Sequence, residues 1–82
     1  GDMEILLIFG ARSQALRCAN MLRASAYRAA IVSAPAFASG GSCSLAVSTD
    51  GAGYSFFRQS AGAYSSLKGA YMQSGGKYTR IF

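Results

Sequence analysis

The chain has 82 residues, of which 51% are hydrophobic and only one is proline, and it carries a formal net charge of +5. This length and composition predict a single folded domain, residues 1–82, and exclude a disordered chain. No apolar run reaches the roughly 18 residues that a membrane-spanning helix needs, so we expect no association with a membrane.

Strand and helix signals alternate in the first half of the chain. Residues 4–9 form a continuous apolar run with β-branched isoleucines, which predicts a buried strand. We expect no signal peptide there, and we expect Gly1 to be a remnant of expression. A helical period follows over residues 12–26, with Ser13 as the predicted N-cap and a start one or two residues earlier as the alternative. Its apolar face is predicted to carry Ala15, Leu16, Ala19, Leu22 and Ala26, with Cys18 and Met21 beside it.

The remaining elements are predicted from alternation and turn residues. Residues 28–33 predict a second strand, and residues 44–49, which alternate polar and apolar, predict a third. Asp50 is a good N-cap for a second helix that begins near residue 52. The face of this helix is predicted to carry Phe57, Ala61 and Tyr64. A strand at 70–73, a tight turn at 74–76 and a final strand at 77–82 complete the chain.

This order of elements predicts an α+β fold with both helices on one face of a sheet, the ferredoxin-like or split βαβ plan. The second and third strands are predicted to pair antiparallel, and the segment from Pro35 to Cys43 connects them. An irregular connection of this length between two strands is a place where function is often found.

The residue types that are missing exclude most hydrolytic and metal chemistry. The chain has no histidine and only three acidic residues, so it lacks histidine-based nucleophile pairs, and we expect no paired-carboxylate site. Two separated cysteines do not complete a zinc site within one chain. We therefore expect neither an enzyme nor a bound metal or cofactor.

Cys43 remains as the candidate reactive group. Gly40 and Gly41 permit backbone N–H groups to turn toward the sulfur, and Ser42 and Ser44 add hydroxyl donors on either side. The alternative is that Cys43 is a small apolar residue at the start of a strand, as free cysteines often are. Cys18, in the middle of a predicted helix, is interpreted as a packing residue, with a role as resolving partner for Cys43 as the alternative.

The eight basic residues are dispersed along the chain and form no run, so nucleic-acid binding is the weakest of the functional hypotheses. Arg12 follows the first strand directly and has two interpretations: an anion ligand at a helix N-terminus, or a solvated surface residue, which is favoured.

Four pieces of the sequence form a pattern: FGARSQAL at 9–16, Met21-Leu22, Pro35, and SCSLAV at 42–47. The pattern resembles the small selenium/sulfur (Se/S) carrier-like proteins of bacteria and archaea. This resemblance implies a cytoplasmic carrier that holds a persulfide or selenopersulfide on Cys43, with a cysteine desulfurase as donor and a second protein as acceptor. Ser44 stands where the family has glycine, and the second helix is rich in glycine and aromatic residues where the family has charged ones.

A hypothesis of a different class stays open beside the carrier. In it, the chain is a small homo-oligomeric binding or regulatory module, and Cys43 serves only in packing.

Overall fold

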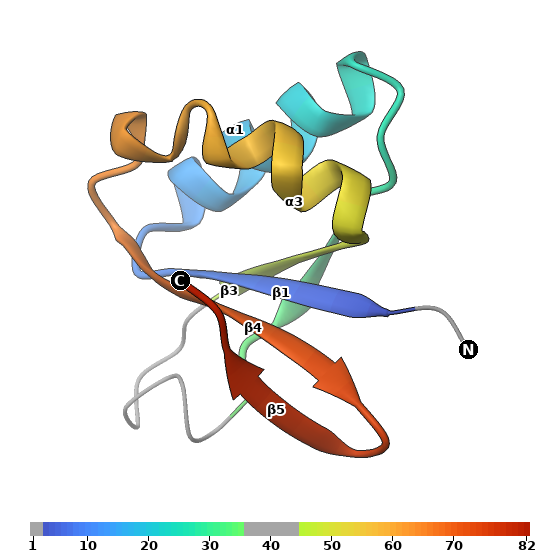
Figure 1. Ribbon diagram of the computed structural model, residues 1–82. Helices are drawn as coiled ribbons and strands as arrows, with labels where there is room; N and C mark the ends of the chain where they lie inside the picture. Colours follow the sequence, from blue (N-terminus) through green and yellow to red (C-terminus); the bar gives the residue numbers. More distant parts are fainter. Residues whose placement is uncertain (1–2, 36–44) are drawn as a thin grey trace.

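The computed structural model describes residues 3–35 and 45–82, which form a sheet with helices packed over one face (Figure 1). The helices are α1 (Arg12–Ala24), α3 (Gly51–Arg58) and the short 3-10 helix η1 (Ala61–Ala63). The strands are β1 (Glu4–Phe9), β2 (Ala30–Ser33), β3 (Leu45–Thr49), β4 (Leu67–Ser74) and β5 (Lys77–Arg80). The α+β class predicted from the sequence is confirmed. No helix in this part of the chain is long and apolar enough to cross a membrane.

The sheet has the strand order β2-β3-β1-β4-β5, and every neighbouring pair is antiparallel. The predicted antiparallel pairing of the second and third strands is confirmed. β1 lies at the centre, and five of its six residues are buried, which explains why its sequence is a continuous apolar run instead of an alternating one.

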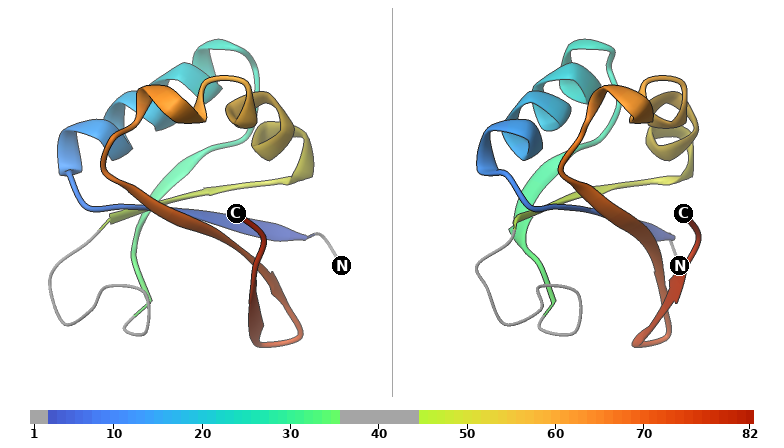
Figure 2. Two further views of the ribbon diagram at one scale, coloured as in Figure 1. Left: turned by 60° about the vertical axis from the view of Figure 1, so that its left-hand side comes forward. Right: turned by 90° about the vertical axis from the view of Figure 1, so that its left-hand side faces the viewer.

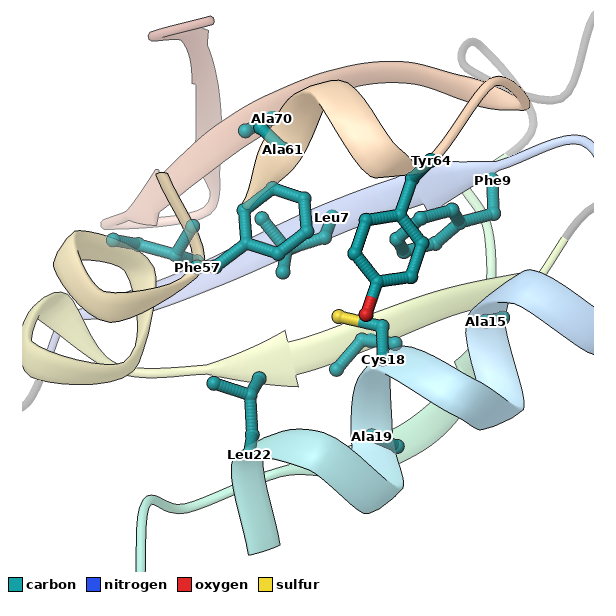
Figure 3. Packing of buried hydrophobic residues seen from close by; sticks show 12 residues of the cluster. Leu7, Phe9, Ala15, Cys18, Ala19, Leu22, Phe57, Ala61, Tyr64 and Ala70 are labelled. Carbon is teal, nitrogen blue, oxygen red and sulfur yellow. The ribbon is translucent and has the colours of Figure 1, made fainter. Parts of the chain in front are cut away.

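The helix-facing side of the sheet carries the larger core. Alternate residues of a strand point to opposite faces. Leu7 and Phe9 therefore pack against α1 and α3 (Figure 3), while Leu6 and Ile8 face the other side. On that second face, Leu6 and Ile8 pack with Ala46 and partly buried neighbours.

The predicted buried face of α1 was partly wrong. Leu16 is 45% exposed, and Ala26 is an exposed residue beyond the helix end with a φ of 66°. Cys18, predicted beside the face, lies at its centre with no exposed surface. Ser13 is not the N-cap, because Ala11 occupies that position and makes no side-chain cap. The residues of α1 that are buried are Ala15, Cys18, Ala19 and Leu22.

Several helix and strand boundaries also differ from the predicted ones. The predicted face of the second helix included Ala61 and Tyr64, with the end of the helix left open, but α3 ends at Arg58, and η1 then carries the chain to the buried Tyr64. β2 begins two residues later than predicted, at Ala30. β4 begins at Leu67, before the predicted start at residue 70, and its pairing with β1 shifts register beside Gly69, whose φ is +156°. A backbone angle of this kind favours glycine.

Candidate functional site

The two ends of the β2–β3 connection lie together at one end of the sheet. Ser33 and Leu45 form the last register pair of β2 and β3, and Leu45 also pairs with Phe9 at the end of β1. Pro35 is partly buried just beyond β2. Cys43 and its predicted supporting residues Gly40, Gly41, Ser42 and Ser44 lie outside the described residues. The structure therefore gives the frame of the candidate site, which we call the Leu45 end of the sheet.

The first turn of α1 brings positive charge to the Leu45 end. α1 starts three residues after Phe9, with the exposed Arg12 as its first residue. No acidic residue occupies this turn, and no side chain caps its free N–H groups. The N-terminus of a helix carries a partial positive charge, so Arg12 and the uncapped backbone both favour an anion near this end of the sheet.

The described carboxylates lie at the opposite end of the sheet. Glu4 begins β1, and its Oε2 accepts a hydrogen bond from Ser48 Oγ at 2.6 Å. Asp50 follows the last residue of β3, and its Oδ1 accepts from the Gly53 N–H at 2.9 Å. Each carboxylate accepts one of these hydrogen bonds, and the register pair Ile5–Thr49 marks the end at which both are found. Within the described ranges, the Leu45 end thus carries Arg12 and no carboxylate, whereas the far end carries both carboxylates together with Arg28.

A side chain that sequence reasoning missed fixes the start of α1 at the Leu45 end. Gln14 Oε1 accepts hydrogen bonds from the Ser66 N–H at 2.8 Å and from Ser66 Oγ at 2.7 Å, and Gln14 Nε2 donates to Ser65 Oγ at 3.0 Å. The partners are more than fifty positions away along the chain, so no local pattern signals them. These bonds join the first turn of α1 to the chain that leads into β4.

Cys18 is a packing residue, as predicted. Its side chain has no exposed surface, and burial raises the pKa of its thiol to about 12, although the nearby Arg17 acts in the opposite direction. The hydroxyl end of Tyr64 points toward it (Figure 3), and burial together with Cys18 raises the pKa of Tyr64 as well. A thiol in this setting is protonated and inaccessible at neutral pH, which argues against a resolving role in this conformation.

Arg17 is an exposed residue of α1 that also contacts the chain after α3. Its Nη2 donates to the Ala63 carbonyl at 2.9 Å, and its guanidinium carbon lies 4.7 Å from the centroid of the Tyr64 ring. It therefore joins α1 to η1. In the described ranges, no group of three His, Cys, Asp or Glu side chains is placed to hold a metal ion.

Comparison with known proteins adds no further constraint on this site. No protein-family model, curated protein or solved structure matches the chain.

Proposed function

We propose that this protein is a non-catalytic carrier of sulfur or selenium, of the Se/S carrier-like type, with the transferred atom bound to Cys43. The observation that carries the proposal is the charge distribution over the sheet. The connection that contains Cys43 begins and ends at the Leu45 end, where Arg12 and the uncapped N-terminus of α1 lie, whereas Glu4 and Asp50 lie at the far end. Positive potential of this kind favours a thiolate over a thiol.

The strand order supports a ferredoxin-like frame for the carrier. β3 lies between β1 and β2, so the β1–α1–β2 unit is split, and β1 lies between β3 and β4, so the β3–α3–β4 unit is split in the same way. Two interlocked split βαβ units are the signature of that plan. β5 is then an addition at the β4 edge.

Each transfer step needs only Cys43 and the cysteine of the donor or acceptor. The Cys43 thiolate attacks the outer sulfur of a donor persulfide, and a new S–S bond forms on Cys43. The S–S bond of the donor breaks, and the donor cysteine leaves with the electron pair as a thiolate that takes up a proton from water. An acceptor thiolate later removes the outer atom from Cys43 by the same exchange, so no net oxidation occurs. Selenium follows the same course as a selenopersulfide.

Because Cys18 is buried, the proposal predicts that only the sulfur of Cys43 carries the transferred atom. Its protonated, inaccessible thiol does not compete for the transferred atom. A reducing compartment such as the cytoplasm suits a carrier of this kind, because Cys43 must return to the free thiolate after each transfer.

The test is sulfur loading measured by intact mass. The protein is incubated with a cysteine desulfurase and cysteine, and the mass gain of one sulfur atom is expected in the parent protein and in Cys18→Ala, but not in Cys43→Ser. Loading that persists in Cys43→Ser overturns the proposal. So does a Cys43 that resists iodoacetamide in the folded protein, because a carrier thiol must be accessible.

A further inference from the structure

The two edge strands of the sheet, β2 and β5, differ in how well they are protected against pairing with another chain. An exposed edge strand offers unpaired backbone groups, and proteins often protect such edges with charged residues. β5 follows this rule, since Lys77 and Arg80 lie in a four-residue strand that is exposed throughout. β2, at the other edge, has the sequence AIVS with no charge and no proline, and among the described strands it pairs only with β3.

The outer side of α1 borders the β2 edge. Arg12, Leu16 and Arg23 are exposed, and at about 100° per residue their positions fall within about 40° of one another on the helix. Arg23 Nε donates to the Ala29 carbonyl at 3.0 Å, directly before β2, so this side of α1 lies beside the start of β2 at the C-terminal end of the helix. α1 and β2 lie on one flank of the molecule and β4–β5 on the other (Figure 2). We call β2 and these exposed residues of α1, together with Arg28, the β2 flank.

Cations stand at both ends of this flank. Arg28 is exposed two positions before β2, and its own carbonyl is fixed by a hydrogen bond from Thr49 Oγ1 at 2.6 Å. Arg12 begins α1 at the opposite end of β2, where Ser33 pairs with Leu45. Leu16, which is 45% exposed, lies between them as an apolar contact. The flank thus has an uncharged strand edge, one exposed leucine, and arginines before and after.

The positions of these arginines indicate which kind of chain the β2 flank binds. If two copies paired through β2 in an antiparallel manner, Arg12 of each copy would approach Arg28 of the other, and like charges across an interface oppose association. An acidic chain meets the same cations favourably. We propose that the β2 flank binds an extended acidic segment of a partner protein, which adds a sixth strand to the sheet beside β2.

In this mode the backbone of the segment pairs with the edge of β2 that no other described strand occupies, and alternate side chains point to the two faces. Acidic side chains near the ends of the segment meet Arg28 and Arg12, and an apolar one covers Leu16. The docking requires only described residues of the chain and does not depend on the chemistry of Cys43, so it stands or falls separately from the carrier function.

The test measures the binding of three labelled hexapeptides by fluorescence anisotropy at low salt. The peptides are Glu-Val-Glu-Val-Glu-Val, its lysine counterpart Lys-Val-Lys-Val-Lys-Val, and the acidic peptide with every backbone nitrogen methylated. We expect only the unmodified acidic peptide to bind well, with affinity at least on the order of tenfold above the other two. Amide hydrogen exchange in β2 is expected to slow when this peptide is bound.

A pair of variants with the same charge change locates the site. Arg28→Glu is expected to weaken binding by roughly fivefold to tenfold, whereas Lys77→Glu, on the opposite edge, changes it by less than about twofold. Both side chains are exposed, and circular dichroism checks that both variants fold.

Three results would overturn the proposal. One is equal binding of the methylated and unmodified acidic peptides, which would mean attraction without strand pairing. Another is equal weakening by the two variants. The third is a dimer in sedimentation experiments with β2 amides protected in the absence of peptide, because a second copy would then occupy the flank.

Discussion

Gly53 and Thr49 illustrate how a single contact sets the packing of α3 on the sheet. Thr49 is fully buried, and its hydroxyl is committed to the Arg28 carbonyl. A Cβ at Gly53 would overlap Thr49 Oγ1 and also approach its Cβ to 3.3 Å. The glycine therefore lets the first turn of α3 rest directly on the end of β3.

The first prediction is that Gly53→Ala destabilises the protein, although alanine is the better helix former by about 1 kcal/mol. Overpacking costs roughly 1–3 kcal/mol, and the overlap with the fixed Thr49 Oγ1 puts the cost in the upper part of this range, above that gain. Gly62→Ala is the control, because a Cβ there meets nothing within 4 Å. Urea denaturation of both variants checks the difference, and equal midpoints would contradict the proposed clash.

The buried thiol of Cys18 predicts a loss of stability in alkaline solution. Its pKa is about 12 in the folded chain, against 9.0 for an unperturbed cysteine thiol, so between these values the unfolded chain releases a proton that the folded chain keeps. The contribution of Cys18 is therefore complete below about pH 9 and falls as the pH rises, by up to about 1.4 kcal/mol per pH unit. Tyr64, whose pKa is also raised, acts in the same direction.

Urea denaturation from about pH 8 to about pH 10.5 measures this effect. Cys18→Ala removes the titrating group and should give a flatter dependence of the unfolding free energy on pH, even though the variant is less stable throughout. A slope that is the same in both proteins would show that other groups cause the alkaline loss.

At the scale of elements, the two helices begin in different ways. Asp50 caps α3 through its Oδ1, whereas the N-cap residue of α1, Ala11, provides no side-chain cap. Asp50→Ala is predicted to cost about 1 kcal/mol. Ser13→Ala should change stability by less than about 0.5 kcal/mol, because Ser13 is an exposed residue inside α1 and makes no cap. Thermal denaturation compares the two, and an equal loss from both would assign a capping role to Ser13 after all.

Some helix and strand boundaries can be predicted from local sequence patterns alone, and others cannot. Residues 4–9 form the predicted strand because a run this apolar is stable only between two covered faces. The start of α3 was also predictable, because Asp50 and the N–H group that it caps lie within one helical turn of each other. The end of α3 was not: the spacing of Phe57, Ala61 and Tyr64 suits one helix, but Tyr64 reaches the core through the separate helix η1. Burial of Tyr64 against Phe9 depends on partners far apart in the chain.

At the scale of the molecule, the class of fold and the pairing of β2 with β3 followed from the order of elements. The candidate site was less accessible to sequence reasoning. The convergence of Phe9, Leu45 and the first turn of α1 at one end of the sheet depends on register, and the Gln14–Ser66 contact joins positions more than fifty residues apart. Leu16 was predicted to be buried because its spacing fits the apolar face of α1. The small alanines of α1 bring the helix close to the sheet, so the buried stripe of the helix is narrower and Leu16 lies outside it.

The core of the whole molecule centres on three aromatic rings from three elements. Phe9 of β1, Phe57 of α3 and Tyr64 after η1 lie with ring centroids 5.5 to 6.2 Å apart (Figure 3). Phe57 has no exposed surface. Because the sheet and α3 meet through these rings, we expect them to unfold as one unit.

Phe57→Ala is therefore predicted to cost about 3–5 kcal/mol, a large part of the roughly 5–15 kcal/mol that stabilises a small domain. Phe82→Ala, at a side chain that is 42% exposed, should cost much less. Native-state hydrogen exchange measures the consequence: the slowest amides of β1 and those of α3 should lose the same free energy of opening in Phe57→Ala. If only the α3 amides lose protection while β1 keeps its value, α3 opens independently, and the three rings do not couple the helix to the sheet.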